Sequence, residues 1–359
     1  MELNLHALRR EIDRIDNNLL QMLQKRIEVA RLIIRFKKET NQDINVPSRE
    51  QEIIDNLMGR ERSLLSSEVI RDIYERIFVE SKRIQAEEKP LVAFQGEHGA
   101  FSEMAARQWN PDIVPIPCAE FTDIFQGVTE GSYEYGIVPI ENTAGGIASH
   151  VNGALRNAKH PLYIVGAVEM SMRHCLLIAP GTDHRSLRRV YSHPAVLAEC
   201  SEFIERMKLE PVQYFDTAGA AKMLAEKVPE ATAAIAGDLA AKYYHLDILV
   251  DGIGNVENTR TRFVVLSGEP RTDGGNKCSL VFTLPDRAGA LFSVLKLFAD
   301  ADINLTRIDS VPDNANPNDF AFFIDFSEDA RNPVVQDILK EIESQAVFYR
   351  FLGCYTEKV

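Results

Sequence analysis

Two cationic side chains lie on what the sequence predicts to be the apolar face of a long helix. Arg26 comes four residues after Met22 and seven before Ile33, which both lie on that face. Lys37 follows Arg26 by eleven residues, about three helical turns, so their Cα atoms would be roughly 16 Å apart on one side. Inward-facing cations are costly to bury unless an anion meets them. By spacing alone, a surface face with snorkelling side chains explains the pair at least as well as an anion site.

Three further features accompany this pair. Arg49 and Glu50 follow Pro47 at a predicted helix start. Ser81 and Gln85 are four residues apart and therefore share one face of the last predicted helix of this segment. Together with the pair they supply cations, a carboxylate, a hydroxyl and an amide, without an evident nucleophile. Such a set suits a reaction of a dianion that needs only positioning and electrostatic stabilisation.

The long helix that must carry the first cations spans residues 5–38, which contain neither proline nor glycine. It would be roughly 50 Å long, and two shorter helices within residues 1–89 cannot cover that length. We therefore expect a second copy of the chain to cover it, unless the helix breaks midway. Arg9 lies roughly 100° off the face of Arg26 and about 25 Å from it. It could reach the ligand of a partner chain more easily than its own.

Composition narrows the class of protein. At about 150 residues per domain, 359 residues suggest two or three domains, and the 45% hydrophobic content fits a globular protein. No apolar run is long enough for a membrane span, and no secretory signal is visible. The five cysteines never occur as Cys-x-x-Cys, which favours the cytoplasm, and histidine spacing indicates no metal site. The net charge of −13 disfavours nucleic-acid binding.

The motifs of the first segment resemble those of the all-helical chorismate mutase family. They are Ala7-Leu8-Arg9, Gln24-Lys25-Arg26, Lys37, Arg49-Glu50 and Ser81-x-x-x-Gln85. The resemblance implies an interlocked dimer in which Arg26 and the Arg9 of a second copy hold the two carboxylates of chorismate. It also implies that Lys37 and Gln85 face the ether oxygen, while Glu50 meets the ring hydroxyl and Ser81 assists the ring carboxylate. Val46 departs from the acid that this family often has there, so the hydroxyl contact is expected to be thinner.

The middle of the chain alternates short apolar runs with helical patterns, which predicts an α/β fold beginning after the polar break at residues 86–90. The predicted strands are 91–94, 137–140, 162–170, 175–179, 232–236 and 263–267, and the predicted helices begin after Ser102 and span 149–158, 195–207 and 218–226. A glycine-containing loop at residues 94–102 offers backbone N–H groups to an anion, or is an ordinary turn. Glu141-Asn142-Thr143 follows a predicted strand, where ligands bind or a helix is capped.

Four short motifs occur in the order and approximate spacing of the prephenate dehydratase family, over about residues 90–268. They are Gly-Ala-Phe-Ser (99–102), Pro-Ile-Glu-Asn-Thr (139–143), Ser-His-Pro (192–194) and Thr-Arg-Phe (261–263). The resemblance implies two α/β lobes with a cleft between them, as in periplasmic binding proteins. It places the essential threonine at Thr261, with Arg262 supporting acidic groups and Phe263 packing behind, and with Glu141, Asn142 and Ser192 lining the cleft. Glu199 and Ala221 depart from the residues of some members, which leaves the general acid unassigned.

The last segment follows a second polar break at residues 268–277 and has the order strand, helix, strand, strand, helix, strand. The predicted elements are 279–284, 289–301, 303–311, 320–326, 333–344 and 347–354, and their order is that of a ferredoxin-like α+β fold. With the turn at residues 286–292 it resembles an ACT domain. That resemblance implies phenylalanine binding through Gly289, Ala290 and Leu291 and through Asp309 and Ser310. Val311 replaces the arginine of the family motif, so a dimerisation module without effector is the alternative.

The three resemblances together describe one multidomain enzyme of phenylalanine biosynthesis. We expect a mutase domain at residues 1–89, a dehydratase domain at 90–268 and an ACT domain at 277–355. The substrates would be chorismate and prephenate, the effector phenylalanine and the assembly a homodimer or tetramer, without nucleic acid, membrane, metal or organic cofactor. Two alternatives are an enzyme that prefers arogenate and a regulatory amino-acid-binding protein whose catalytic sites have decayed. Intact Arg26, Lys37, Gln85 and Thr261 argue against such decay.

Overall fold

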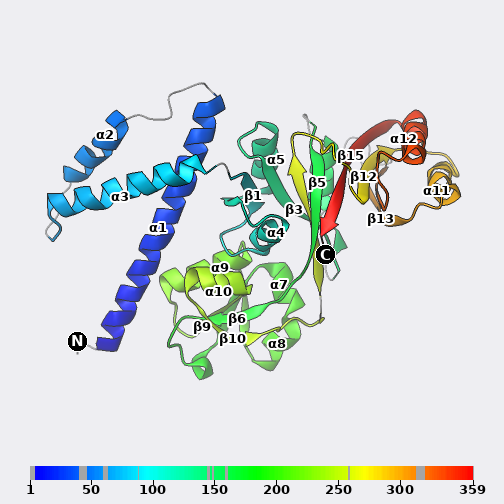
Figure 1. The fold of residues 1–359 in the computed structure, drawn as a ribbon. Coiled ribbons are helices and arrows are strands. Elements are labelled where there is room, and N and C mark those ends of the chain that lie inside the picture. Colours follow the sequence, from blue (N-terminus) through cyan, green and yellow to red (C-terminus); the bar gives the residue numbers. More distant parts are fainter. Residues whose placement is uncertain are drawn as a thin grey trace. The chain divides into compact units, whose positions relative to one another are not determined.

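The computed structural model describes residues 5–39, 47–59, 64–87, 89–143, 146–147, 149–157, 161–257, 259–312 and 320–358. The chain separates into two compact units, Met1–Lys89 and Pro90–Val359, and each is described by itself. Figure 1 shows the helical first unit in blue to cyan and the second in cyan to red. No helix in the described ranges combines the length and the apolar character needed to cross a membrane.

The described part of the first unit is helical. Its helices are α1 (Leu5–Glu39), α2 (Pro47–Met58) and α3 (Ser67–Ala86). The 35 residues of α1 form one continuous helix, which excludes the midway break. A stripe of large apolar side chains on α1 is exposed in the single chain: Leu5, Leu8, Ile12, Ile15, Leu19, Leu20, Met22, Leu23, Val29 and Ile33.

Arg31 fastens α1 to the end of α3. Its guanidinium donates to the backbone carbonyl of Ile84 at 2.9 Å, and to those of Glu87 and Lys89 at 2.6 and 2.9 Å. The last carbonyls of a helix have no partner within the helix, and a cation there also meets the negative end of the helix dipole. Arg31 is thus a structural cation, although it lies among the basic residues that sequence spacing associates with an anion.

A large mixed sheet organises the second unit. Its order is β13-β14-β12-β15-β5-β11-β3-β1-β2, with β4 paired to β3. The strands of this sheet that come from the middle segment of the chain are β1 (Leu91–Gln95), β2 (Val114–Cys118), β3 (Tyr135–Asn142), β4 (Gly146–Ile147), β5 (Tyr163–Ser171) and β11 (Arg260–Ser267). The helices between them that belong to this part are α4 (Phe101–Trp109), α5 (Phe121–Thr129) and α6 (Ser149–Asn157). Strand β11 is antiparallel to both β3 and β5. Strand β11 follows the strands of the smaller sheet in the sequence, so the chain re-enters the large sheet at Arg260.

The smaller sheet has the order β10-β6-β9-β7-β8. Its elements are β6 (Cys175–Ile178), the 3-10 helix His184–Ser186, β7 (Arg189–Ser192), α7 (Pro194–Glu199), α8 (Ser201–Arg206), β8 (Glu210–Gln213), α9 (Thr217–Lys227), β9 (Thr232–Ala236), α10 (Asp238–Tyr244) and β10 (Asp247–Asp251). The helix predicted at residues 195–207 is two helices, which meet at Cys200. Two connections join the sheets, one from β5 to β6 and one from β10 to β11. They meet where the Met172 N–H donates to the Thr259 carbonyl at 2.7 Å.

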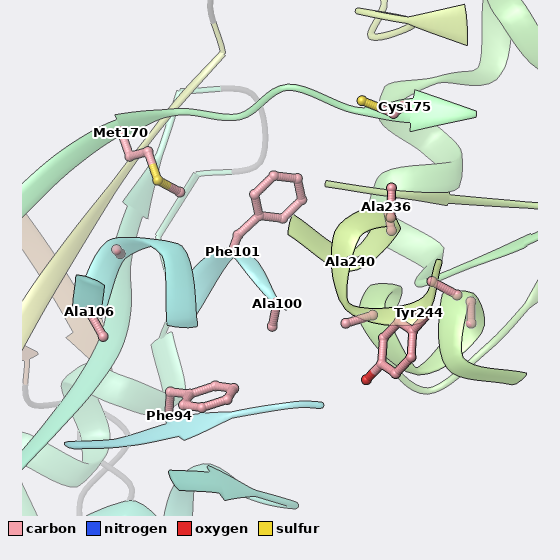
Figure 2. Packing of buried hydrophobic residues seen from close by; sticks show 14 of the residues in the cluster. Phe94, Ala100, Phe101, Ala106, Met170, Cys175, Ala236, Ala240 and Tyr244 are labelled. Carbon is pink, nitrogen blue, oxygen red and sulfur yellow. The ribbon is translucent and has the colours of Figure 1, made fainter. Parts of the chain in front are cut away.

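Apolar side chains from both sheets share one core, seen in Figure 2. Phe94 of β1 and Phe101 of α4 face Ala240 and Tyr244 of α10 across it. The contact is close: a Cβ on Gly99 would lie 2.6 Å from the Ala240 Cα, and Gly99 has φ +88°. Both facts restrict this position to glycine, so the loop before α4 is docked against the smaller sheet's helices.

The C-terminal elements form the predicted ferredoxin-like arrangement. They are β12 (Lys277–Thr283), α11 (Ala290–Asp300), β13 (Leu305–Pro312), β14 (Phe320–Phe326), α12 (Pro333–Gln345) and β15 (Phe348–Lys358). Strand β15 runs beyond its predicted end, and residues Thr356 to Lys358 pair in parallel with Gly166 to Val168 of β5 (Figure 1). Gly353 permits this approach, since a Cβ there would lie 2.2 Å from the Ile164 carbonyl oxygen. One continuous sheet therefore joins the C-terminal strands to the central ones.

Candidate functional site

The structure brings Arg26 and Ser81 together in the helical unit. The Arg26 guanidinium donates to the Ser81 hydroxyl at 2.9 Å and lies 5.2 Å from the centre of the Phe78 ring. Ser81 is buried and Arg26 is half-buried. Helix α3 positions both Phe78 and Ser81, and its N-terminus is capped by the Ser66 hydroxyl, which accepts from the Val69 N–H. A cation held in this way can present its remaining donors to a carboxylate.

The other predicted residues of this unit have different contacts and exposures. Glu50 is half-buried and pairs with Lys82 at 2.8 Å. Arg49 pairs with Glu52 at 2.7 Å on the exposed surface of α2. Lys37 is half-buried and Arg9 is exposed. The side chain of Gln85 and the whole of Val46 lie outside the described part of the chain.

Thr261 lies opposite Asn142 in the register of β11 and β3, so both side chains leave the sheet on the same face. Thr261 is 3% exposed, and its hydroxyl has no hydrogen-bond partner among the described residues. An unpaired buried hydroxyl costs about 1–3 kcal/mol, which is a strong reason to look for a ligand at this point.

The strand ends that carry this pair are held in register by backbone and side-chain bonds. The Arg260 N–H donates to the Thr143 hydroxyl at 2.9 Å, and the Thr143 N–H donates to the Arg260 carbonyl at 3.0 Å. Arg260 also pairs with Glu169 of β5 at 2.9 Å. Glu141 is exposed and lies opposite Arg262 in the register. The position of the Thr261 hydroxyl is thus fixed from both neighbouring strands.

Two predicted residues of the middle segment are engaged in packing. The Ser192 hydroxyl is fully buried and donates to the Ile235 carbonyl at 2.7 Å, which joins β7 to β9. Phe263 is 2% exposed and belongs to the core shared by the two sheets. Neither side chain offers a polar group to a ligand in this arrangement.

Two N–H groups of the glycine-containing loop at residues 94–102 are bonded within the chain. The Gly99 N–H donates to the Glu103 carboxylate at 2.9 Å, and the Glu97 N–H donates to Asp216 at 3.2 Å. Asp216 also caps α9 through the Gly219 N–H at 2.7 Å, and burial raises its pKa. These two loop N–H groups are therefore bonded to carboxylates of the chain itself.

Glu103 is a fully buried acid between α4 and α10. His98, Arg107 and Tyr243 surround it at 3.1, 2.6 and 2.9 Å. Burial raises the pKa of Glu103, but the hydrogen bond from His98, with the charges of His98 and Arg107 and the Gly99 N–H, outweighs burial and leaves it at about 2. Glu103 is thus an ionised structural group.

His174 is a residue that sequence reasoning missed. It lies in the first connection between the sheets, is 2% exposed, and its Nε2 is 2.8 Å from Glu199. Its ring meets that of Phe101 edge to face, with centroids 5.4 Å apart. Glu199, which departs from the family pattern, was the signal in the sequence that could have indicated it, because a carboxylate at a partly buried position needs a hydrogen-bond donor.

Arg262 follows Thr261 but serves the C-terminal strands. Its side chain donates to Asp325 at 2.5 Å, to the Tyr355 hydroxyl at 2.7 Å and to Glu357. Burial lowers the pKa of Arg262, but Tyr355, Asp325 and Glu357 more than compensate and raise it. The arginine is therefore a permanently charged junction between β11 and the C-terminal strands.

The predicted effector residues lie at two places on the C-terminal fold. Gly289 is exposed, has φ +81° and precedes α11, where Ala290 is buried and Leu291 half-buried. On β13, Asp309 is buried in ion-pair contact with Arg307, whereas Ser310 is exposed. The exposed N-terminus of α11 can accept a carboxylate.

Three family models match successive parts of the chain. Chorismate mutase type II matches residues 8–86, prephenate dehydratase residues 92–271 and the ACT domain residues 279–346. The middle match alone spans half of the chain.

Known proteins show the same combination. The bifunctional chorismate mutase/prephenate dehydratase of Pseudomonas aeruginosa is 30% identical over 365 residues, covering 99% of this chain and 98% of its own. An arogenate dehydratase/prephenate dehydratase of Arabidopsis thaliana is 39% identical over 276 residues, covering 74% of this chain and 72% of its own. The crystal structure of prephenate dehydratase from Arthrobacter aurescens in complex with L-Phe is 29% identical with a TM-score of 0.68, covering 74% of this chain and 90% of that one.

Proposed function

The chain belongs to the family of bifunctional chorismate mutase/prephenate dehydratases, and from this premise we propose which residues carry each activity. It rearranges chorismate to prephenate and converts prephenate to phenylpyruvate. We assign the mutase to residues 1–89, the dehydratase to 90–268 and the regulatory module to 277–355.

In the mutase, the rearrangement breaks a carbon–oxygen bond and forms a carbon–carbon bond within one molecule, so no group of the protein has to form a covalent bond. Arg26, oriented by Ser81 and Phe78, holds one carboxylate of chorismate. Lys37 and Gln85 stabilise the charge that develops on the ether oxygen, and Glu50 orients the ring hydroxyl. Donors that strengthen only as this charge develops lower the barrier without tightening substrate binding.

We propose that the mutase is completed by a second copy of the chain. The exposed apolar side chains of α1 support this, because ten large apolar residues on one helix are costly to leave in water. Arg9 is exposed on the same helix and becomes the second carboxylate ligand in the partner's site. A homodimer is the smallest assembly that satisfies both features, and sedimentation velocity of the full chain measures it directly.

In the dehydratase, the bond between the ring and its carboxylate breaks, the carboxylate leaves as carbon dioxide, and the electron pair of that bond completes the aromatic ring. The ring hydroxyl leaves as water after taking a proton. We propose that the Thr261 hydroxyl donates to this leaving oxygen, with Asn142 positioning the substrate beside it. The observation that carries the assignment is the buried Thr261 hydroxyl, which has no partner within the described chain. Glu141 is the register partner of Arg262 and therefore leaves the face of the sheet opposite to that of Thr261, which corrects its predicted place in the site. The Ser192 hydroxyl holds β7 against β9.

We propose that phenylalanine binds the C-terminal module, with its carboxylate at the α11 N-terminus around Gly289, Ala290 and Leu291. The L-Phe complex of the Arthrobacter relative supports this effector. The exposed Ser310 hydroxyl recognises the ammonium group of the amino acid, and Asp309, the preceding residue, is held by Arg307 on the other face of β13. The product of the pathway would then control its own synthesis.

A single assay tests both activities. Purified full-length chain is supplied with chorismate, and prephenate and phenylpyruvate are followed over time. Phenylpyruvate formed from chorismate requires both activities, and prephenate that accumulates without phenylpyruvate contradicts the dehydratase site. If neither product forms from chorismate while added prephenate is still converted, the mutase site is contradicted. Supplying arogenate and prephenate separately tests the alternative substrate, because arogenate yields phenylalanine and prephenate yields phenylpyruvate.

A further inference from the structure

A buried cluster of charges lies where β11 meets the C-terminal strands. It contains as many cations as anions among the described residues: Arg262, Arg307 and Lys277 against Asp309, Asp325 and Glu357. Each of these side chains is at most 13% exposed. Charges so deep are costly unless all are paired, and removing one partner leaves another buried and uncompensated. The members of the cluster are therefore interdependent.

Asp325 occupies the centre of this cluster and is 1% exposed. One carboxylate oxygen accepts from Arg262 at 2.5 Å and lies 3.9 Å from Arg307, and the other accepts from the Ser279 hydroxyl at 2.6 Å. Ser279 in turn lies 2.7 Å from the Tyr355 hydroxyl. The carboxylate thus faces two cations that belong to different parts of the fold.

Arg262 is next to the dehydratase residue Thr261, whereas Arg307 contacts Asp309 of the proposed effector region. Arg262 is the residue after Thr261 on β11, so its side chain leaves the opposite face of the sheet and fixes the backbone that carries the threonine. Arg307 lies on β13, two residues before Asp309, with which it is in ion-pair contact. It also donates to the Asn152 side chain of α6 at 3.1 Å. A movement of β13 would therefore change the field and the position of Asp325.

We propose that Asp325 is a positioning residue that holds Thr261 through Arg262 and transmits the state of β13 to it through Arg307. The transmission rests on phenylalanine binding near Asp309 and Ser310, as proposed above, whereas the positioning role does not. A buried cluster in which every charged group has an ion-pair contact suits this purpose, because few arrangements of its side chains keep all of the charges compensated. A small displacement at one end must therefore move the groups at the other end.

The chain contains its own reporter at this junction. Trp109 is the single tryptophan of the sequence. Its ring packs on β5, since a Cβ on Gly166 would lie 2.6 Å from the indole nitrogen, and its carbonyl accepts from the Lys358 ammonium at 2.6 Å. Gly166 is also the register partner of Thr356 on β15. Indole emission therefore reports on the place where the C-terminal strands join the central ones.

The test compares full-length Asp325→Asn with Asp300→Asn, which makes the same chemical change in an exposed pair with Lys296 on α11. Dehydratase kcat and KM, phenylalanine inhibition, phenylalanine binding by calorimetry and Trp109 emission are measured. Asp325→Asn is expected to lower dehydratase kcat about tenfold with little change in KM. It is also expected to weaken the inhibition reached at saturating phenylalanine, while calorimetric affinity stays within about threefold. Asp300→Asn should match the parent chain in all of these measurements.

Arg307→Lys keeps the charge balance and serves as the second variant if Asp325→Asn does not fold. It should weaken inhibition by phenylalanine and reduce the change in Trp109 emission, with binding retained. Unchanged dehydratase kcat in a folded Asp325→Asn overturns the positioning role. An unchanged inhibition curve in either variant overturns the transmission. If the parent chain binds no phenylalanine, the effector proposal fails, and the kcat of Asp325→Asn still decides the positioning role.

Discussion

Thr261 and Asn142 are register partners on adjacent antiparallel strands, and their side chains share one face of the large sheet. A backbone hydrogen bond from the Thr143 N–H to the Arg260 carbonyl, and a bond from the Arg260 N–H to the Thr143 hydroxyl, close the strand ends immediately beside them. The pair is thus positioned by β-sheet geometry rather than by a mobile loop. Rigid placement of this kind is what a site that works by orientation requires.

Replacing Thr261 with valine should separate activity from stability. The change keeps the shape of the side chain and removes a buried hydroxyl that has no partner within the described chain, so unfolding should cost the same or about 1 kcal/mol more. Dehydratase kcat should nevertheless fall at least about a hundredfold. Denaturant unfolding and phenylpyruvate formation measure the two effects, and Thr261→Ser should recover most of the rate. A Thr261→Val enzyme with parental turnover would remove the threonine from the mechanism.

Replacing Arg26 with methionine should abolish the mutase alone. The variant keeps the aliphatic part that packs near Phe78 but loses the cation that contacts Ser81 and, in our proposal, substrate. We expect prephenate formation to fall about a thousandfold, with helix content by circular dichroism and dehydratase rate unchanged. Arg83→Met is the matched control, because Arg83 pairs with Glu80 on the exposed side of α3. Equal mutase rates in the two variants would contradict the site.

Glu103 should make the second unit sensitive to acid. The pKa of Glu103 is about 2 in the folded chain, below its usual value of 4.5, so its stabilisation is complete above pH 4.5 and is lost as the pH falls toward 2. Glu103→Gln should therefore lower the free energy of unfolding by about 3 kcal/mol at pH 7, and by about half of that at pH 3. Guanidinium unfolding followed by Trp109 emission measures this on the same helix.

The control for Glu103 is Glu130→Gln, because Glu130 is exposed and accepts only a surface hydrogen bond from Gln126 among those described. That variant should unfold like the parent at both pH values. A pH-independent difference between Glu103→Gln and the parent would mean that the carboxylate stabilises by packing and not by its charge.

Gly353→Ala should disrupt the junction between β15 and β5. The new Cβ would lie 2.2 Å from the Ile164 carbonyl oxygen, a distance that only a displacement of one strand can relieve. We expect a loss of about 2–4 kcal/mol in unfolding free energy and a shift in Trp109 emission. Gly153→Ala, in the middle of α6 with no atom within 4 Å of the new Cβ, should instead stabilise by up to about 1 kcal/mol. Similar effects of the two changes would show that β15 adapts freely.

Local sequence patterns predicted the elements that have strong periodicity. Helix α1 and strand β14 appear where the apolar pattern placed them, because each carries its full signal within its own residues. Strands β2 and β8 escaped prediction because Pro115, Pro117 and Pro211 argue against strands. Both lie at an edge of their sheet, where a missing N–H is tolerated.

The chemistry of the site was predictable as residue types and not as contacts. Thr261 was identified through its motif, but no local signal pairs Arg262 with Asp325 and Glu357, which come 63 and 95 residues later. The sequence also could not show that Arg26 and Arg31 have different roles, since both are arginines of the same helix. Only tertiary packing shows that Arg31 binds backbone carbonyls at the end of α3.

The shared sheet has a consequence for protein engineering. A cut after residue 268, made to obtain a feedback-free catalyst, would strip β5 of its neighbour β15 and leave an open, sticky edge. The same cut would remove both acidic partners of Arg262, because Asp325 and Glu357 lie after residue 268. The C-terminal module therefore cannot be removed without damage to the catalytic part of the second unit. Variants that phenylalanine no longer inhibits should be sought by point substitution within the intact chain.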